Sequence, residues 1–236
     1  MSYRTVVMSD LHLGSKACKS DEILKFLDAL DCYNLILNGD IIDGWALNRG
    51  SKWKEKHTKI VRKILKIAEK GTNVIWVRGN HDDFLESYIG LTLGNITVVD
   101  ELKYKGKNKK IYYIIHGDKL DVFSSKFKII AKIGSIGYDF ALWLNTWYNK
   151  YRKWRGLPYY SISKKIKDSV KQAVSFMEDF ETNAIKLSKI KKCDGIICGH
   201  IHHPTLKDNY MNSGDWCENL TALIEDNTGK WTIYQM

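Results

Sequence analysis

Residues that commonly bind metal ions recur in five short clusters along the sequence. Each cluster follows a short apolar or β-branched run, and five of the seven histidines lie in these clusters. The clusters are Asp10-x-His12, Gly39-Asp40-x-x-Asp43, Gly79-Asn80-His81-Asp82, His116-Gly117-Asp118 and Gly199-His200-x-His202. Oxygen and imidazole ligands without thiolates suit manganese, iron or zinc and disfavour a zinc–cysteine site. The clusters therefore predict a metal centre with oxygen and nitrogen ligands.

The apolar runs before these clusters predict the strands of a layered α/β fold. Residues 3–9, 33–38 and 73–78 are short and β-branched, as buried strands are. Residues 20–30 and 54–70, which separate them, carry apolar residues at helical spacing. In such sheets ligands bind at the carboxyl ends of the strands, which is where the clusters stand. The glycines in the clusters let the backbone turn sharply, so that the next side chain faces the cleft.

The second half of the chain is predicted to contain further strands, interrupted by a long helical region. The strands are expected at 111–115, 194–198, 210–212, 221–225 and 231–234, and the last three, with glycine-containing turns, suggest an antiparallel edge. The helical region covers 124–190. One apolar stripe runs from Ile136 to Trp154 and a second from Ile166 to Ala184, with a turn around Pro158 between them.

Length and composition favour a globular protein. With 236 residues, 44% of them hydrophobic and 27% charged, the chain can form one sizeable α/β domain with a small lobe, and disordered or fibrous classes are excluded. No basic stretch precedes a long apolar core at the N-terminus, which argues against a cleaved secretory signal. The five cysteines show no CxxC spacing, so we expect core cysteines in a reducing cytoplasm. The apolar stretch 129–147 contains Lys132 and Asp139, which argues against a membrane span.

The basic residues are concentrated in one part of the helical region. Residues 123–171 hold eleven Lys and Arg against Asp139 and Asp168, together with eleven of the 28 aromatic residues. We therefore expect an acidic partner there. An aromatic stripe beside cations suits an anionic membrane surface and an acyl chain. It also suits a single-stranded nucleic acid, and it could simply pack on the α/β body.

The order and spacing of the five clusters resemble the calcineurin-like metallophosphoesterase family over essentially the whole chain. The resemblance implies a four-layer αββα sandwich with a helical cap insertion. The metallophosphoesterase domain would comprise residues 1–122 and 191–236, and the cap would comprise residues 123–190.

The same resemblance implies two divalent metal ions and their ligands. The first ion would be held by Asp10, His12, Asp40 and His202, and the second by Asp40, Asn80, His116 and His200, so that Asp40 bridges. Ions about 3.5–4 Å apart can share a water and lower its pKa. His81, oriented by Asp43, would lie beside the phosphate with Asn80 and stabilise the transition state or protonate the leaving oxygen. Asp82 and Asp118 are expected to support the ligands, and His57 and His203 to be solvent-facing or structural.

A narrower resemblance concerns the substrate. The sequences Ser9-Asp-Leu-His-Leu-Gly14, Gly39-Asp-Ile-Ile-Asp-Gly-Trp45 and Asn212-Ser-Gly-Asp-Trp216, with the helical insertion after His116-Gly-Asp118, are similar to the UDP-2,3-diacylglucosamine diphosphatase group. That group acts in lipid A synthesis. This implies cleavage of a diphosphate to UMP and a lipid phosphate, at the inner membrane face in the cytoplasm, generally with manganese. Ser161, Ser163 and Lys164 in the cap would contact the substrate, and the acyl chains would lie under the cap. The proteobacterial enzymes of the group carry Arg where this chain has His81.

Two other functions stay open at this point. A nuclease or nucleotide phosphodiesterase could use the same metals, with the basic segment on nucleic acid. A non-catalytic interaction module could dispense with metal ligands, yet every expected ligand position is filled here. Iron and zinc remain alternatives to manganese, and the oligomeric state is not predicted.

Overall fold

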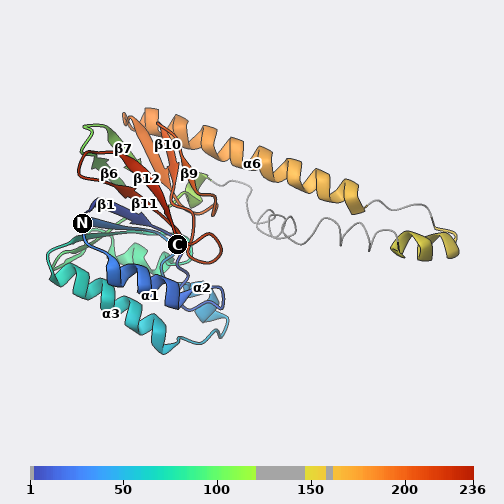
Figure 1. The fold of residues 1–236 in the computed structure, drawn as a ribbon, viewed down its shortest axis with the longest axis horizontal. Coiled ribbons are helices and arrows are strands. Elements are labelled where there is room, and N and C mark those ends of the chain that lie inside the picture. The colour runs from blue at the N-terminus through green and yellow to red at the C-terminus, as the bar shows by residue number, and fades with distance from the viewer. Residues whose placement is uncertain (1–2, 121–146, 158–161) are drawn as a thin grey trace. The chain divides into compact units, whose positions relative to one another are not determined.

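The computed structural model describes residues 3–120, 147–157 and 162–236, with side chains outside the description from 162 to 173. The chain divides into two compact units (Figure 1). The first unit comprises Met1–Asp118 and Ala184–Met236, and the second comprises Lys119–Asn183. The predicted cap boundaries, 123 and 190, stay a prediction, because 121–146 and 158–161 lie outside the described residues.

A seven-stranded sheet forms the centre of the first unit, in the order β12-β11-β1-β2-β3-β5-β4. Its strands are β1 (Tyr3–Met8), β2 (Cys32–Asn38), β3 (Asn73–Val77), β4 (Thr92–Leu93), β5 (Ile96–Val99), β11 (Thr221–Glu225) and β12 (Trp231–Gln235). Strands β1, β2, β3 and β5 are parallel, while β4, β11 and β12 are antiparallel to their neighbours. The parallel strands β1, β2 and β3 end in candidate ligand clusters, so their carboxyl ends meet at one edge.

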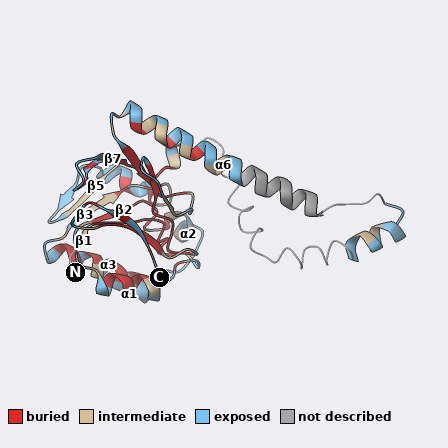
Figure 2. Ribbon diagram, turned by 45° about the horizontal axis from the view of Figure 1, so that its top comes forward, coloured by how far each residue is buried: buried red, intermediate tan, exposed pale blue. Residues whose placement is uncertain are grey.

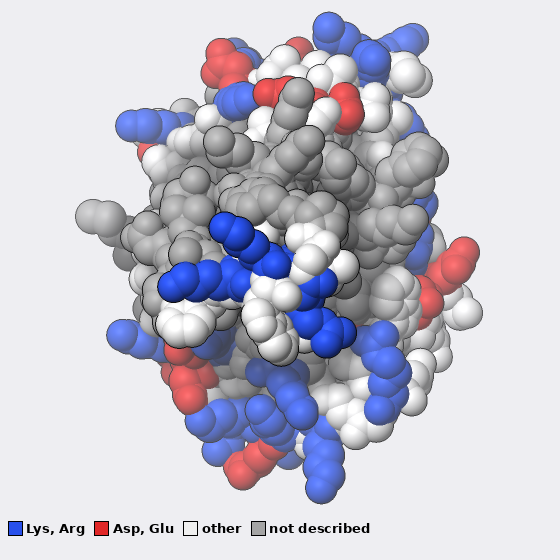
Figure 3. All heavy atoms as spheres, turned by 90° about the vertical axis from the view of Figure 1, so that its right-hand side faces the viewer, with Lys and Arg blue, Asp and Glu red and all other residues white. Residues whose placement is uncertain are grey.

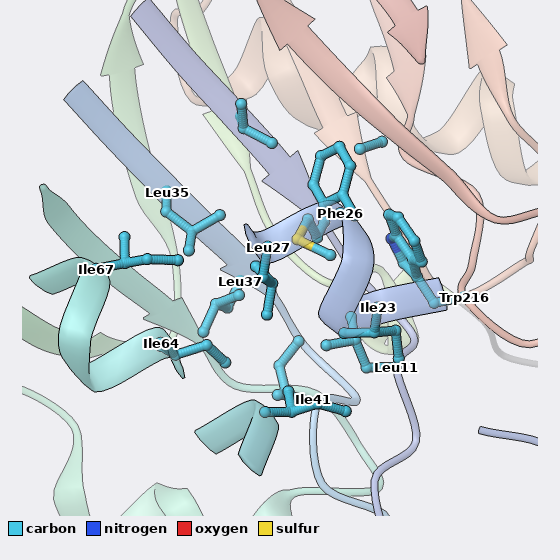
Figure 4. Packing of buried hydrophobic residues seen from close by; sticks show 14 of the residues in the cluster. Leu11, Ile23, Phe26, Leu27, Leu35, Leu37, Ile41, Ile64, Ile67 and Trp216 are labelled. Atoms are coloured by element: carbon cyan, nitrogen blue, oxygen red, sulfur yellow. The ribbon is translucent and has the colours of Figure 1, made fainter. Parts of the chain in front are cut away.

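Two amphipathic helices cover one face of this sheet. They are α1 (Ser20–Ala29) and α3 (Glu55–Glu69). Their apolar residues are buried against the sheet, while the opposite helix faces are exposed (Figure 2). The Phe26 and Trp216 ring centroids are 4.9 Å apart. Figure 4 shows these two rings side by side, with Ile67 near the strand residue Leu35 and Ile64 near Leu37. Burial of this apolar stripe is what holds the helices on the sheet.

A second, five-stranded sheet packs on the other face, in the order β6-β7-β8-β10-β9. Its strands are β6 (Leu102–Lys105), β7 (Ile111–Ile114), β8 (Gly195–Cys198), β9 (Thr205–Leu206) and β10 (Tyr210–Asn212). Val7 and Ile36 of the first sheet share an apolar core with Ile114 and Ile197 of the second. In the same unit, the end of α6 (Ile162–Ile190) buries Ala184 and Ser188. Helices and two sheets in this arrangement confirm the predicted αββα class.

One predicted strand grouping is wrong. Strand β10 does not join β11 and β12 in an antiparallel edge, since it pairs parallel to β8 in the other sheet. All three β10 residues are buried, because the strand lies between β8 and β9 inside the second sheet. At the edge of the first sheet they would be more exposed. Only β11 and β12 form the expected antiparallel hairpin.

The remaining short elements lie in loops. They are α2 (Gly44–Asn48) and the 3₁₀ turns η1 (Asp83–Tyr88) and η2 (Asp118–Leu120). Asp43 caps α2 by accepting a hydrogen bond from the Ala46 backbone N–H at 2.8 Å.

In the second unit, residues 147–154 form a helix. Four aromatic side chains on it are exposed, among the cations Lys150, Arg152 and Lys153; they are Trp147, Tyr148, Tyr151 and Trp154. Lys and Arg side chains gather on the face shown in Figure 3. The earlier part of the predicted stripe, from Ile136, lies outside the described residues. Among the described residues, no helix combines the length and apolarity that crossing a bilayer requires.

Candidate metal centre

The five predicted clusters meet at one edge of the sandwich. Three of them follow β1, β2 and β3 of the seven-stranded sheet, and two follow β7 and β8 of the five-stranded sheet. The backbone ties these loops together, because Asp10 N–H donates to the Gly39 carbonyl at 3.1 Å and Gly199 N–H donates to the His116 carbonyl at 2.9 Å. Both sheets therefore contribute side chains to one site.

The first group of potential ligands contains Asp10, His12 and His202, whose ligand atoms lie within 4.8 Å of one another. His202 Nε2 lies 3.0 Å from Asp10 Oδ1, and His12 Nε2 lies 3.8 Å from the same oxygen. Asp10 is fully buried, and its other oxygen accepts the His200 backbone N–H at 3.0 Å. One carboxylate oxygen therefore faces the two imidazoles, while the other is held by the backbone.

The second group contains Asp40, His116 and His200, again within 4.8 Å of one another. His116 Nε2 lies 3.3 Å from Asp40 Oδ2. His12 Nε2 of the first group lies 3.8 Å from that same oxygen. Asp40 thus stands between the two groups, as a ligand shared by two ions would.

The chemistry of the buried atoms fits metal ions. Asp40 Oδ2, Asn80 Oδ1 and His116 Nε2 are buried and form no hydrogen bond with any part of the chain that the structure describes. Buried polar atoms normally have partners, and leaving one unsatisfied costs about 1–3 kcal/mol. Asp40 Oδ2 and His116 Nε2 belong to the second group, and all three atoms are oxygen or imidazole ligands of the kind that a divalent cation binds.

Backbone strain is concentrated at these same positions. Asp10, His12, Asp40, His200 and His202 all have positive φ, between 48° and 68°. Residues other than glycine rarely adopt this left-handed conformation, and such strain persists where the surrounding structure enforces it. The strain turns each side chain toward the common edge directly after its strand.

Two glycines make room for the ligands. A Cβ on Gly39, whose φ is +81°, would lie 2.4 Å from the His116 ring. A Cβ on Gly79 would lie 2.4 Å from the Asp40 backbone nitrogen and carboxylate. Both clashes are with the potential ligands themselves, so glycine is needed here for close approach.

A third group links the site to the predicted catalytic histidine. Asp43 accepts a hydrogen bond from His81 Nδ1 at 2.9 Å through Oδ1, and its Oδ2 lies 3.4 Å from His12 Nδ1. With both Nδ1 atoms turned to Asp43, both Nε2 atoms face Asp40 Oδ2, at 3.9 Å for His81 and 3.8 Å for His12. One carboxylate therefore fixes the orientation of two imidazoles.

Asp82 holds the loops rather than pointing into the site. Its carboxylate is buried and accepts hydrogen bonds from Gly79 N–H at 2.6 Å, Ile41 N–H at 3.0 Å and Trp76 Nε1 at 3.2 Å. It thereby ties the loop after β3 to the loop after β2. Asp118, the first residue of η2, is half-buried.

The charges in the site perturb one another. Burial raises the pKa of Asp10 and Asp40, but the neighbouring histidines outweigh burial and hold both pKa values well below the usual range. Burial lowers the pKa of His116, yet Asp40 and Asp10 outweigh it and raise the pKa to about 10. Without metal, His116 thus balances the two carboxylates as a cation.

The other predicted residues fall outside this centre. His57 is fully buried at the start of α3, where its Nδ1 accepts the Lys54 backbone N–H, so of the two expected placements it takes the structural one. His203 is exposed. Ser161 lies outside the described residues, and Ser163 and Lys164 fall in α6 where side chains are not described. Sequence reasoning included Trp45 in a motif but did not assign it to the site, where its ring centroid lies 4.3 Å from that of His81.

Comparisons with known proteins agree with this geometry. A family model described as calcineurin-like phosphoesterase matches residues 3–204. The chain is 32% identical over 122 residues to a UDP-2,3-diacylglucosamine hydrolase from Neisseria gonorrhoeae, and the match covers 48% of each protein. The chain therefore matches about half the length of that curated relative.

The chain was also matched to solved structures, with low scores. A single mutant of Vps29 from Entamoeba histolytica matches with a TM-score of 0.45 at 11% identity, covering 98% of both chains. Nuclease MPE from Pseudomonas putida matches with a TM-score of 0.28 at 27% identity, covering 42% of this chain and 48% of that one.

The family match and the hydrolase-named relative confirm the predicted class, a metal-dependent phosphohydrolase, and the ligand groups fit the divalent metals of that class. The family model spans most of the chain and includes every cluster that contributes to the centre. This chain belongs to the calcineurin-like phosphoesterase family.

Proposed function

We propose that the chain hydrolyses the diphosphate of a UDP-linked diacyl sugar, releasing UMP and a lipid monosaccharide phosphate, with two divalent ions bound at the centre. The observation that carries the proposal is the pair of ligand groups that share Asp40, together with the buried Asp40, Asn80 and His116 atoms that lack hydrogen bonds in the described chain. Asp10, His12, Asp40 and His202 would hold one ion. Asp40, Asn80, His116 and His200 would hold the other.

The ions supply the chemistry that the side chains lack. When bound, they would withdraw charge from the phosphate oxygens and lower the pKa of a water that they share. The oxygen and nitrogen ligands accept several metals, and manganese is the ion we propose, with iron and zinc as alternatives.

The chain's own catalytic group is His81. Its Nδ1 is engaged by Asp43, so its Nε2 faces the centre. There Nε2–H would donate to a phosphate oxygen, stabilising the charge that develops as the phosphorus–oxygen bond breaks. Asp43 keeps the imidazole oriented by accepting the hydrogen bond from Nδ1. Asn80, the preceding residue on the same loop, would lie beside the phosphate.

The substrate class rests on two supports. The relative from Neisseria gonorrhoeae is named for UDP-2,3-diacylglucosamine. The segment 123–171 carries the basic and aromatic residues that a nucleotide-linked lipid would need, and its described helix exposes both kinds of side chain. We propose that Ser161, Ser163 and Lys164 in this segment contact the substrate. We also propose that the segment meets an anionic membrane surface, which would place the protein peripherally on the cytoplasmic face.

A competitive assay tests the function. Purified manganese-loaded protein is given UDP-2,3-diacylglucosamine, short single-stranded DNA and an aryl phosphodiester in parallel. We expect UMP release that is lost in Asp40→Asn and His81→Ala but kept in His203→Ala, because His203 is exposed outside the centre. Cleavage of DNA without UMP release would replace the lipid substrate with a nucleic acid. No hydrolysis of any substrate by metal-loaded protein would contradict the enzymatic role.

A further inference from the structure

The imidazole of His81 has ring contacts in addition to its hydrogen bond with Asp43. The Trp45 indole lies over one face of the ring, with centroids 4.3 Å apart and planes tilted by 35°. The edge of His12 meets it at 4.7 Å in a perpendicular arrangement. Only 14% of the His81 side chain is exposed. The ring is therefore enclosed between an indole, a second imidazole and Asp43.

Trp45 and Asp43 reach His81 from the same short helix. Asp43 is the N-cap of α2 and Trp45 is the second residue of that helix. Between them, the Gly44 N–H donates to the His81 carbonyl at 2.9 Å. A Cβ on Gly44 would lie 2.9 Å from that carbonyl oxygen, so the helix start is pressed against His81. Three consecutive residues at the start of α2 therefore contact His81: Asp43 bonds its Nδ1, Gly44 bonds its carbonyl, and Trp45 packs on its ring.

The hydrogen bond from Nδ1 alone does not fix the ring plane. A single donor–acceptor contact leaves the imidazole free to swing about the line that joins the two atoms, and the angle at a carboxylate oxygen varies widely. A large flat neighbour removes that freedom, because the two rings must stay in contact. Since Nε2 is the atom that faces Asp40, the ring plane decides where its proton points.

Trp45 is not explained as a core residue. Its side chain is 40% exposed, and α2 contains no buried residue. Trp53, a few residues further along, is also 40% exposed, but its ring contacts His57, which lies outside the centre. The two tryptophans therefore make a matched pair that differs in which histidine each one touches.

We infer that Trp45 is a positioning residue, whose indole holds the His81 imidazole in the plane that directs Nε2 to the reacting phosphate. This inference rests on the proposed catalytic role of His81. Because Trp45 acts through His81, its removal should matter only when that imidazole is present.

Kinetics of the manganese-loaded protein on bis(4-nitrophenyl) phosphate test the inference. We expect Trp45→Ala to lower kcat between about 10- and 100-fold, with KM and bound manganese unchanged, because a small misplacement of a catalytic group has effects of that size. Trp45→Phe should restore most of the rate, and Trp53→Ala should match the unsubstituted protein. In the His81→Ala background, Trp45→Ala should cause no further loss.

Two kinetic results would overturn the inference. One is an equal loss of rate from Trp45→Ala with and without His81, which would mean that the indole acts on the substrate directly. The other is a rise in KM at unchanged kcat, which would have the same meaning.

An NMR measurement separates this inference from the proposed function, since it needs no turnover. The ring protons of His81, identified by their absence in His81→Ala, should be shifted upfield by the indole face. That shift should disappear in Trp45→Ala and persist in Trp53→Ala. Unchanged His81 signals in Trp45→Ala would overturn the inference even if the protein were active. If the upfield shift disappears in Trp45→Ala but the unsubstituted protein hydrolyses none of the substrates, the contact between Trp45 and His81 is confirmed and the proposed function is contradicted.

Discussion

His202 Nε2 lies 3.0 Å from Asp10 Oδ1, which joins the loop after β8 in one sheet to the loop after β1 in the other. The two residues are 192 positions apart in the chain. Neither sheet alone contains a full set of ligands, so the centre exists only because the two sheets pack face to face.

Removing His202 should weaken metal binding far more than removing its neighbour. The His202→Ala variant loses an imidazole from the group with Asp10 and His12, whereas His203 is exposed and belongs to no group. Changing a residue that hydrogen-bonds to a metal ligand lowers metal affinity roughly 10- to 100-fold. We expect His202→Ala, which removes a ligand itself, to lower manganese affinity more than that. Manganese titrations of the metal-free variants measure this. Equal affinities for His202→Ala and His203→Ala would contradict the assignment.

Metal binding should release a proton from His116. Asp40 and Asp10 raise its pKa to about 10, so it is protonated in the metal-free protein at neutral pH, whereas a bound ion needs the neutral imidazole. Calorimetry at pH 7.5 in buffers of different ionisation enthalpy should show proton release that is reduced in His116→Gln. The same proton release in both proteins would exclude His116 as its source.

The same pKa gives a pH dependence of stability in the metal-free protein. The folded value of about 10 stands above the ordinary histidine value of about 6.5, so protonation stabilises the fold. This contribution is complete below about pH 6.5 and is lost as the pH rises through about 10. Urea unfolding between these limits should show falling stability, with a flatter curve in His116→Gln. Stability that rises with pH over this range would be the wrong sign.

Alanine at Gly39 should damage the centre as well as the backbone. Gly39 and Gly50 have similar positive φ, +81° and +87°, but a Cβ on Gly39 meets the His116 ring while nothing lies within 4 Å of one on Gly50. Gly50→Ala should cost about 1–2 kcal/mol of unfolding free energy from strain alone. Gly39→Ala should cost more and also bind metal more weakly. Thermal unfolding and metal titration of both variants check this, and equal behaviour would contradict the clash.

The buried contact between the sheets should contribute to stability. The Tyr104 hydroxyl donates a hydrogen bond to Glu225, which is fully buried. The same hydroxyl oxygen lies 2.5 Å from Thr5 Oγ1. Tyr104→Phe leaves the buried carboxylate with the Lys107 N–H at 2.7 Å, and should cost about 2 kcal/mol. In Tyr113→Phe the carboxylate that loses its hydrogen bond is Glu101, which is partly exposed and paired with Lys191. The loss of unfolding free energy should therefore stay below about 1 kcal/mol. Urea unfolding compares the two.

The sequence predicted the site better than the connections around it. Asp10, Asp40 and His116 could be identified because each follows an apolar run, and because carboxylates and imidazoles directly after buried strands have few structural uses. The same runs predicted a layered α/β fold, whereas the four-layer sandwich was implied by the family resemblance. The residues chosen as ligands lie together at one edge, although their roles stay proposals.

What the sequence did not reveal depends on tertiary packing. Strand β10 is short and apolar, and nothing local distinguishes pairing with β8 from pairing with β11. Trp45 stands in the five-residue helix α2, which is too short to show a periodic pattern, and only its contact with His81 shows its place. His57 was expected to be exposed or structural, and in the structure it is buried, with its Nδ1 bonded to the Lys54 N–H and its ring against Trp53.

The central claim is that two ions share one site through Asp40. Electron paramagnetic resonance of the metal-free protein titrated with manganese tests it most directly. We expect two manganese ions per chain with the spectrum of an exchange-coupled pair, lost in Asp40→Asn and kept in His203→Ala, because His203 is exposed outside the centre. A spectrum of isolated ions at saturation, or binding of a single ion by the unsubstituted protein, would contradict it.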